Sequence, residues 1–473
     1  MGLVRLLFAA VVLLGGGAEA RAADTVKLER ELGRKFALEA AARLPIVRDP
    51  DLVTYVRRTG AKIVESLGPQ PFRYRFFVVR DGRVNAFAVP GGYVYVHTGL
   101  LLEAANDDEV AGVLAHEVAH VHAHHLLRQQ EKTRLVNYAT LLALLGSFLD
   151  PAIGAAAIGA QAAAQLKYSR EFEQEADYLG ARYMQSAGFD ARGLLDFFHK
   201  LWERQRTTPT FLPPFLLTHP LSEERLNNLE AVLRTRQWES AARRPPSREL
   251  RWAKFWARIR TSSPQEAAAD YARAHEAEPG DPVSASILGA ALVESGDLER
   301  ARAVLEPLAP RDARARRELG RALFRLRETD RAAELLRSVT AEEPDDALAW
   351  FELGRVLVSS RRWDAALEAF RNALRVLPDF EEAHRELGLA AGRAGREGEG
   401  FFHLAEAARC GGDYGTAIGH YRRAIERLDD PAAKERAEKT APRTPGIRRK
   451  QALSSAQERR RSSWSTRAKN CSR

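Results

Sequence analysis

Hydrophobic and polar residues follow different periods in the first part of the chain, and each period predicts a different kind of element. Residues 28–44 and 51–67 place apolar side chains at helical intervals, so each stretch predicts a helix. Residues 72–79 switch to an alternating pattern, which is typical of a strand. Residues 84–89 and 93–96 read as two more short strands, and a Pro-Gly-Gly turn separates them. This part of the chain therefore predicts helices together with a small β-sheet.

A longer helix is predicted directly after this sheet. Asn106 is a favourable N-cap residue, and Glu109, three positions later, gives a start that resembles a capping box. The apolar residues from Val110 to Val121 then recur at helical spacing. A further helix is predicted around residues 166–184, where the same periodicity returns.

From about residue 250 the pattern becomes a repeat of 34 residues. Proline recurs at positions 310, 344 and 378, and glycine recurs at positions 320, 354 and 388. One copy matches the tetratricopeptide positions one by one, at Trp350, Leu353, Gly354, Ala366, Phe370, Ala373 and Pro378. Weaker copies precede and follow it, so about four to five stacked repeats predict an all-α solenoid with a concave binding surface. The aromatic residues of this solenoid are expected to serve packing.

These changes of pattern divide the chain into five parts. Residues 1–22 have a basic residue, a short apolar run and small residues at the end, as a secretory signal peptide does. An α+β domain is expected at 24–235, and a proline-containing linker is expected at 236–248. The repeats are expected at 249–430. A basic tail at 431–473 has the composition of a disordered segment.

The net charge of +9 adds little to this picture, because the excess lies at one end of the chain. Residues 441–473 hold ten Lys and Arg and one acidic residue, whereas the other 440 residues hold 62 of each sign. A folded part with balanced charge offers no general surface for nucleic acid, so no nucleic-acid partner is expected. The tail allows at most peripheral contact with a membrane. The two cysteines, Cys410 and Cys471, are too few for a disulfide framework.

The candidate chemistry lies on the helix that follows Asn106, where His116, Glu117 and His120 form an H-E-x-x-H motif. Positions four apart lie roughly 40° apart around a helix, so both imidazoles can bind one metal ion. Glu117 lies beside them, where its carboxylate can take a proton from a water molecule at the metal. One zinc ion per chain is therefore the expected cofactor. Three more histidines follow the motif, and they are expected to be solvated or to support the ligands: His122, His124 and His125.

A catalytic zinc needs a third protein ligand. The helix predicted at 166–184 contains Glu173 and Asp177, one helical turn apart on one face. Glu173 can therefore bind the metal while Asp177 orients a histidine ligand from behind. Glu171 and Glu175 are the alternatives to Glu173. Without the upstream histidine pair, a solvated acidic face would be the better interpretation of this segment.

Residues 139–166 are apolar and rich in Ala, Gly and Leu, and they are long enough to cross a membrane. Asp150 and Pro151 in the middle argue against a span, because proline breaks the helix ladder and a carboxylate inside a membrane is costly. Two short helices are expected instead. They are either a mobile cover over the metal site or buried core helices.

H-E-x-x-H followed about fifty residues later by E-x-x-x-D resembles the HtpX and CAAX-prenyl-protease family of gluzincin metallopeptidases. The sequence Thr218-His219-Pro220, with Arg225 five residues after the proline, is similar to the third signature of that family. With the signal peptide and the repeats, the chain is most similar to the periplasmic BepA-like type, over nearly all residues up to about 430. His124 departs from the family pattern, which often has Arg there.

The resemblance implies a mainly α protein: a zincin-like α+β metalloprotease domain with a small β-sheet, followed by an all-α tetratricopeptide-repeat solenoid. It implies a periplasmic zinc endopeptidase that cleaves misfolded or stalled polypeptides during the assembly of outer-membrane proteins. The edge of the sheet would pair with the extended substrate. Such pairing uses backbone groups and therefore depends little on the sequence of the substrate. The repeats would dock onto the outer-membrane assembly machinery.

The resemblance also implies a role for each candidate residue. The zinc ligands would be the two motif histidines and the downstream glutamate, namely His116, His120 and Glu173. Glu117 would be the general base and would later pass its proton to the leaving amine. His219 or Arg225 would stabilise the oxyanion. Asp177 would orient a zinc-bound histidine.

Two alternatives stay open at this point. Pro220 restricts the backbone of His219 and so limits where its imidazole can point. His219 either binds zinc in the resting state and moves away when a substrate or partner opens the site, or donates a hydrogen bond in the transition state. The whole chain is alternatively a chaperone-like assembly or binding factor with a gated or structural zinc site. The intact Glu117 favours the enzyme, because a structural site has no use for a base.

Overall fold

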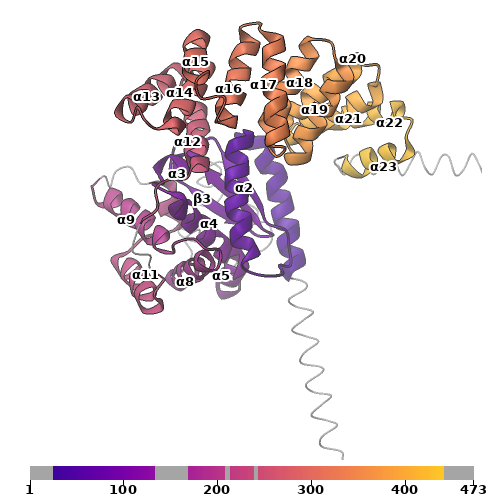
Figure 1. Ribbon diagram of the computed structural model, residues 1–473. Coiled ribbons are helices and arrows are strands. Elements are labelled where there is room, and N and C mark those ends of the chain that lie inside the picture. The colour runs from indigo at the N-terminus through magenta and orange to yellow at the C-terminus, as the bar shows by residue number, and fades with distance from the viewer. Residues whose placement is uncertain (1–24, 134–168, 208–212, 239–242, 442–473) are drawn as a thin grey trace, which may run out of the picture. The chain divides into compact units, whose positions relative to one another are not determined.

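The computed structural model describes residues 25–133, 169–207, 213–238 and 243–441. The expected signal peptide, the apolar stretch 139–166 and residues 442–473, which hold the whole basic excess, lie outside the described residues. Within them the chain is mainly helical and has a single small sheet, which confirms the predicted fold class (Figure 1). The helices before the repeats are, in chain order, residues 25–43, α2 (Pro50–Glu65), α3 (Thr98–Glu103), α4 (Asp107–His122), α5 (His125–Thr133), α8 (Arg170–Ser186), α9 (Arg192–Thr207), α10 (Pro214–Thr218) and α11 (Glu223–Arg236).

The sheet has four strands in the order β1-β2-β4-β3. The central strands β2 (Arg75–Val79) and β4 (Tyr93–His97) run parallel, and β1 (Ile46–Val47) pairs antiparallel with β2. β3 (Ala86–Val89) pairs antiparallel with β4 and forms one edge of the sheet. The predicted turn between β3 and β4 is present, with positive φ angles of 83° and 88° at its two glycines, a conformation that glycine adopts without strain.

Helices cover both faces of this sheet. The helix over residues 25–43 packs Phe36 against Phe87 and Tyr95. These two residues point to the same face because they are directly opposite each other in the pairing of β3 with β4. Helices α2 and α4 pack on the opposite face. The strands β3 and β4 are therefore buried throughout, in keeping with their nearly continuous apolar sequences.

Helix α4 begins where the sequence predicts. The side chain of Asn106 accepts a hydrogen bond of 3.0 Å from the backbone N–H of Glu109. The carboxylate of Glu109 accepts from the N–H of Ala105, one residue before the cap, so the motif differs by one position from a reciprocal capping box. Three acidic residues in the first turn also complement the helix dipole.

A glycine lets α8 approach α4 closely. A Cβ atom on Gly180 would lie only 3.1 Å from the backbone nitrogen of His116. Because glycine has no side chain, α8 can pack closely against α4 beside the H-E-x-x-H motif. This contact sets the distance from the acidic residues of α8 to the two motif histidines.

The repeats continue directly from this part of the chain. The described residues form two compact units, one ending at Phe380 and the other beginning at Glu381. The predicted boundaries near residues 235 and 249 thus both fall inside the first unit. Its repeat helices are α12 (Arg248–Thr261), α13 (Pro264–Ala277), α14 (Pro282–Ser295), α15 (Leu298–Leu305), α16 (Ala313–Arg325), α17 (Thr329–Glu342), α18 (Ala347–Ser359) and α19 (Trp363–Val376). The second unit contains α20 (Glu381–Arg393), α21 (Glu397–Cys410), α22 (Tyr414–Arg427) and α23 (Pro431–Thr440).

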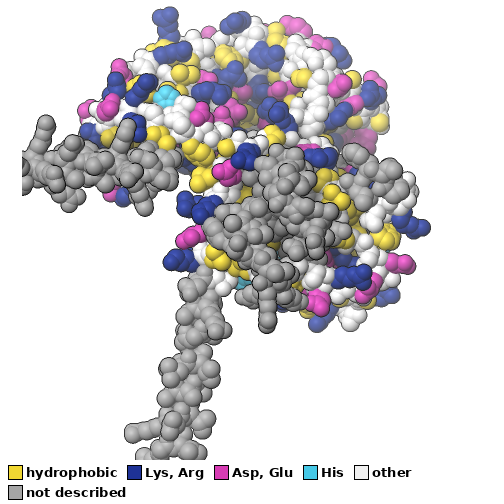
Figure 2. All heavy atoms as spheres, turned by 180° about the vertical axis from the view of Figure 1, so that it is seen from behind, with side chains coloured by type: hydrophobic (Ala, Val, Ile, Leu, Met, Phe, Trp, Pro, Cys, Tyr) yellow, Lys and Arg dark blue, Asp and Glu magenta, His cyan; other side chains and the backbone are white. Residues whose placement is uncertain are grey.

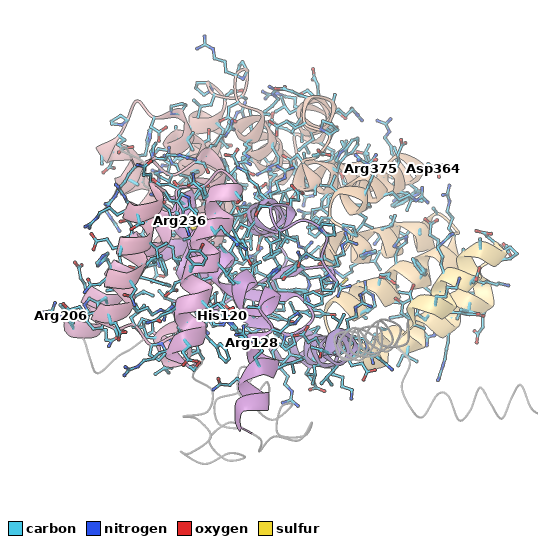
Figure 3. The ribbon with its side chains drawn as sticks, turned by 90° about the horizontal axis from the view of Figure 1, so that it is seen from below. His120, Arg128, Arg206, Arg236, Asp364 and Arg375 are labelled. Atoms are coloured by element: carbon cyan, nitrogen blue, oxygen red, sulfur yellow. The ribbon has the colours of Figure 1, made fainter. Side chains whose placement is uncertain are left out.

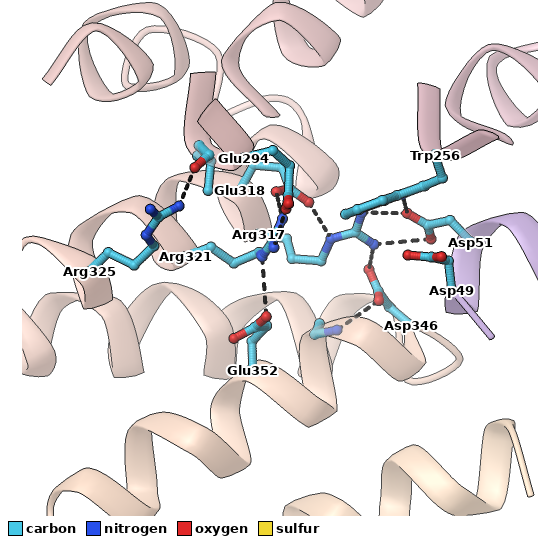
Figure 4. Close-up of polar contacts among 12 residues, drawn as sticks. Asp49, Asp51, Trp256, Glu294, Arg317, Glu318, Arg321, Arg325, Asp346 and Glu352 are labelled. Carbon is cyan, nitrogen blue, oxygen red and sulfur yellow. Dashed lines mark hydrogen bonds and ion pairs between the residues drawn. The ribbon is translucent and has the colours of Figure 1, made fainter. Parts of the chain in front are cut away.

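Within the first unit, α2 and the repeat helices meet at a buried ionic network (Figure 4). Arg317 of α16 is fully buried and contacts Asp51 of α2 at 2.6 Å and Asp346 at 2.7 Å. The indole N–H of Trp256 on α12 also donates to Asp51, at 3.0 Å. The sheet-bearing part and the first repeat helices therefore share buried polar contacts.

The surface of the described residues mixes both charges, as the sequence predicts for the folded part. On the face drawn in Figure 2, Lys and Arg are interspersed with Asp and Glu. Across the part of the chain that the structure describes, no helix combines the length and the apolar character needed to cross a membrane.

Candidate metal centre

Helix α4 places the H-E-x-x-H residues in the interior of the protein. His116, Glu117 and His120 are each at most 2% exposed. The Nε2 atoms of His116 and His120 lie 3.0 Å apart, so the two rings point to a common place, as their spacing predicts. Glu117 lies beside them, and the backbone of Ala88 in the edge strand β3 is close enough to its carboxylate to favour the charged form.

Helix α8 supplies two carboxylates to this place. Glu173 Oε2 lies 3.6 Å from His116 Nε2, and Glu173 Oε1 lies 3.5 Å from His120 Nε2. One turn later, Asp177 Oδ1 lies 3.0 Å from the other ring nitrogen of His116, Nδ1. The structure therefore brings Glu173 to the inner side of the histidines and Asp177 to the outer side of His116. The two alternatives to Glu173 do not join this cluster: Glu171 and Glu175.

His219, at the end of α10, completes the cluster. Its Nδ1 lies 3.0 Å from Glu173 Oε1 and 3.3 Å from His116 Nε2. Its Nε2 lies 3.4 Å from Glu117 Oε1. The ring stacks on Phe215 with 4.7 Å between the ring centroids. His219 thus lies between the two glutamates, with one ring nitrogen toward each.

Arg225, on α11, lies behind the cluster and binds both carboxylates of α8. Its Nε and Nη2 donate to Asp177 at 2.5 and 2.8 Å. Its Nη1 lies 2.6 Å from Glu173 Oε2 and also donates to the carbonyl of Pro220 at 3.1 Å. Every guanidinium nitrogen therefore has a partner in this arrangement. These contacts orient Glu173 and Asp177, which is a different task from the expected stabilisation of an oxyanion.

Burial and neighbouring charges set the protonation of the site. Burial raises the pKa of Glu117, although His219 and His116 oppose this effect. Burial also favours the protonated forms of Glu173 and Asp177, but the Arg225 cation outweighs it and lowers the pKa of both. Burial lowers the pKa of His120 well below its ordinary value. For His116 burial acts in the same direction, but Asp177 and Glu173 raise the pKa to about 9.

The donor set fits a zinc ion. One ligand atom from each of His116, His120, Glu173 and His219 can be chosen so that all four lie within 4.8 Å of one another. Three imidazoles and one carboxylate are donors that zinc accepts, and all four residues are buried. Glu117 Oε1 is also buried and forms no hydrogen bond with the described residues, although His219 Nε2 is near it. A polar atom in that position suits a residue that acts on a bound water or substrate.

The other histidines of the run contact different partners. His122 Nδ1 lies 3.2 Å from the side-chain oxygen of Gln70, and His124 Nδ1 lies 2.9 Å from Glu29 Oε2. His125 is fully buried and contacts His120. Among the described residues, none of the three joins the metal-binding cluster.

The contact between His125 and His120 agrees with the expectation that a histidine of this run supports a ligand, but the sequence did not show which of the three does so. Five residues along a continuous helix would place the two rings on different faces. The structure differs because α4 ends at His122 and His124 adopts a left-handed conformation with φ of 53°, which turns the chain back. No periodicity in the sequence signals that turn.

Comparison with known families defines the class of this domain. Residues 50–233 match peptidase family M48, and residues 288–347, 317–374 and 351–401 match the tetratricopeptide repeat. The chain therefore carries a peptidase family M48 domain followed by tetratricopeptide repeats. This result confirms the resemblance drawn from the H-E-x-x-H and E-x-x-x-D motifs and from the 34-residue period.

Individual relatives refine the comparison. The beta-barrel assembly-enhancing protease of Escherichia coli strain K12 is 31% identical over 218 residues, or 44% of this chain and 45% of the relative. A Vibrio cholerae protein provisionally given the same name is 39% identical over 217 residues, again 44% of this chain and 45% of the relative. The mitochondrial metalloendopeptidase OMA1 of Schizosaccharomyces pombe is 33% identical over 182 residues, covering 38% of this chain and 52% of the relative. Each similarity thus spans only about half of the relative.

Proposed function

We propose that this protein is a zinc-dependent endopeptidase. The observation that carries the proposal is the buried cluster of His116, His120, Glu173 and His219 with Glu117 directly beside it. A purely structural zinc site would not need a fifth, ionisable residue at that position. The peptidase family M48 domain, which spans all of these residues, supports the same activity.

His116, His120 and Glu173 would hold the zinc ion, with His219 within reach as a fourth ligand. When bound, the ion would supply a Lewis acid that polarises the scissile carbonyl and makes water more acidic. Asp177 fixes the ring of His116 through its outer nitrogen, and Arg225 fixes the carboxylates of Asp177 and Glu173.

Glu117 is the proposed general base. Because burial raises its pKa, its carboxylate binds a proton more readily than an exposed glutamate does. It would take a proton from the attacking water and later deliver it to the amine nitrogen of the leaving peptide. The backbone of Ala88 in the edge strand β3 is close enough to this carboxylate to lower its pKa slightly against the effect of burial.

An extended segment of an unfolded polypeptide is the proposed substrate. β3 pairs with β4 on one side only, so an added strand would pair with its other edge. All four residues of β3 are buried, so that edge would have to be uncovered before a substrate could pair with it. Since Ala88 in β3 contacts Glu117, a peptide paired with β3 would lie close to the general base. Backbone pairing has little sequence preference, which suits misfolded or misassembled substrates.

The names of the relatives support a setting for this activity. We propose that the protein acts in the periplasm, in quality control of outer-membrane protein assembly. Several relatives named beta-barrel assembly-enhancing protease support the assembly role. The repeats would then dock onto the assembly machinery, since stacked helical repeats form extended surfaces for protein partners.

The decisive experiment measures zinc and cleavage together. Elemental analysis should find about one zinc ion per chain, and the protein should digest unfolded casein. Glu117→Gln should keep the zinc and lose cleavage by at least about a hundredfold, because only the base is removed. A wild-type protein that binds zinc but cleaves no unfolded substrate would favour the alternative function, a binding or assembly factor with a gated site. A protein without zinc would refute the proposal.

The role of His219 needs its own variant. Its position in the cluster supports a resting ligand that must move before a substrate is cleaved. In that case His219→Ala should raise basal cleavage with zinc retained. If His219 instead donates to the oxyanion, the same variant should lower cleavage by roughly ten- to a thousandfold.

A further inference from the structure

Behind His120 lies a chain of side chains that the proposed mechanism does not use. The Nδ1 atom of His125 lies 3.0 Å from the Nδ1 atom of His120. The Nε2 atom of His125 lies 3.2 Å from Glu175 Oε2 on α8. Glu175 in turn accepts hydrogen bonds from Arg128 Nη1 at 3.1 and 3.0 Å. Figure 3 labels the two ends of this chain, His120 on α4 and Arg128 on α5.

Each neutral imidazole has one nitrogen that donates and one that accepts, and this determines which ring nitrogen of His120 and of His125 carries the proton. His120 directs Nε2 toward the other cluster residues, so metal binding there leaves the proton on its Nδ1. That N–H can only donate, and the atom beside it is Nδ1 of His125, which must accept. A neutral His125 then carries its proton on Nε2, the atom that faces the Glu175 carboxylate. One consistent set of tautomers thereby places a proton donor opposite an acceptor at each contact of this series.

The neighbours of His125 hold its ring in place. The ring stacks on Phe172 with 4.7 Å between centroids and an interplanar angle of 20°. The guanidinium of Arg128 lies over the Phe172 ring, 4.8 Å from its centre. His125 has no exposed surface, so this geometry is part of the protein interior.

We propose that His125 and Glu175 are positioning residues that hold His120 in its metal-binding orientation and fix its tautomer. This inference rests on the proposed zinc site. It adds a second outer contact to that site. Asp177 contacts the ligand His116 directly, whereas Glu175 contacts His125, which in turn contacts the ligand His120. A carboxylate behind a ligand imidazole raises the basicity of that ligand, and loss of such a contact typically costs about ten- to a hundredfold in metal affinity.

The test measures zinc affinity, with Glu117→Gln as the common background so that no cleavage occurs during the measurement. A chromophoric chelator competes for the zinc, and circular dichroism reports the fold of each variant. His125→Leu should weaken zinc binding by about ten- to a hundredfold. His125→Asn should weaken it less, because its amide oxygen can replace the Nδ1 acceptor. Glu175→Gln should also give a smaller loss.

His122→Leu is the matched control, since His122 belongs to the same run but contacts Gln70. It should keep zinc affinity within about twofold of the background protein. Equal affinities for His125→Leu and His122→Leu would overturn the proposal. If His125→Leu does not fold, the Asn and Gln variants decide instead, and unchanged affinity in both would overturn the proposal.

The tautomer provides a readout that a packing role alone would not change. Nitrogen-15 spectra of histidine-labelled, zinc-loaded protein should show His120 protonated on Nδ1, with a shifted Nδ1 signal in His125→Asn. A His120 protonated on Nε2 would contradict the proposal. Failure to cleave casein would refute the proposed function and leave this result intact, whereas absence of zinc binding would refute both.

Discussion

Arg225 and Arg317 are both buried, one at the metal centre and the other between α2 and the repeat helices, and both lose the hydration of their positive charge. The Arg225 side chain is 4% exposed and binds Asp177 and Glu173. The Arg317 side chain is fully buried and binds Asp51 and Asp346. A buried guanidinium costs several kcal/mol of desolvation, and nearby carboxylates are needed to offset it. Arg225 meets this need with two acidic partners, and Arg317 has a third, Glu318, whose Oε1 lies 3.0 Å from its Nε.

The difference lies in what those acidic partners contact next. Asp177 and Glu173 also contact His116, so Arg225 acts on the metal centre. Asp346 caps α18 by accepting from the N–H of Ala349, and Asp51 lies in the first turn of α2. Arg317 thus joins helices of the repeats to the peptidase domain (Figure 4). A buried arginine with two carboxylates therefore does not indicate catalysis unless those carboxylates reach reactive groups.

The largest expected effect separates the two arginines directly. Arg225→Met and Arg317→Met should each destabilise the first compact unit by about 3–5 kcal/mol, because each leaves buried carboxylates without their cation. Only Arg225→Met should also lower zinc affinity, since only its partners contact His116. Urea unfolding and a chelator competition measure the two quantities. Equal loss of zinc affinity in both variants would mean that the repeat contact also controls the metal centre.

The second largest effect is expected at low pH, where the ion pair of Asp51 with Arg317 should contribute less to the free energy of unfolding. Burial favours the protonated form of Asp51, but the charges of Arg317 and Arg314 and hydrogen bonds from Arg317 and Trp256 lower its pKa from 3.8 to about 2. A lowered pKa stabilises the fold above the unfolded value, and this contribution is lost as the pH falls from about 4 to 2. The shift corresponds to about 2–3 kcal/mol.

The matched variant is Asp51→Asn, which cannot titrate. Its stability at neutral pH should be lower than that of the wild type, and the difference between the two proteins should shrink between pH 4 and pH 2. Unfolding curves measured at several pH values in this window provide the check. A constant difference across the window would show that Asp51 is not the titrating group.

The two arginine sites also show how far the sequence alone could lead. The cap at Asn106 and the spacing of His116 and His120 are local, so helical periodicity predicts α4 and the pair of rings on it. The spacing of Glu173 and Asp177 is local in the same way. The helical period orients each such pair but carries no information on which distant segment it will meet.

The contacts that the sequence could not give are long-range. Arg225 and Asp177 are 48 positions apart, and Arg317 and Asp51 are 266 positions apart. Both pairs depend on how helices pack, and charged residues that look solvated in the sequence become buried only in that packing. The resemblance therefore offers Arg225 only as an alternative to His219 at the oxyanion, and the structure places the Arg225 guanidinium on Asp177 and Glu173.

A smaller effect is expected where the repeats begin. Ser247 caps α12 by accepting from the N–H of Leu250, and its hydroxyl donates to Asp107 Oδ1 at 2.7 Å. Asp107 is the first residue of α4, so this contact links the repeats to the helix of the metal site. Ser247→Ala should cost about 1–2 kcal/mol, because the cap and the hydroxyl hydrogen bond to Asp107 are lost, whereas the hydrogen bond from the backbone N–H of residue 247 to Asp107 remains. Ser247→Thr should retain most of the stability in the same urea measurement.

The smallest expected effect concerns a second ionic link between α2 and the repeats. Arg57 of α2 donates to both oxygens of Asp379, at 2.7 and 2.5 Å. The geometry is as good as that of Arg317 with Asp51, but the Arg57 and Asp379 side chains are 32% and 40% exposed. Water and salt therefore screen this pair, and its coupling free energy should be only about 0.2–1 kcal/mol.

A double-mutant cycle with Arg57→Met and Asp379→Asn measures this coupling, and repeating the cycle in 1 M salt should reduce it further. The same cycle with Arg317→Met and Asp51→Asn is the matched comparison, because it has the same ion types joining the same two parts of the chain. Its coupling should be several times larger and less sensitive to salt. Similar values for the two cycles would show that burial does not separate these links, and the distinction drawn between exposed and buried contacts of α2 would then be wrong.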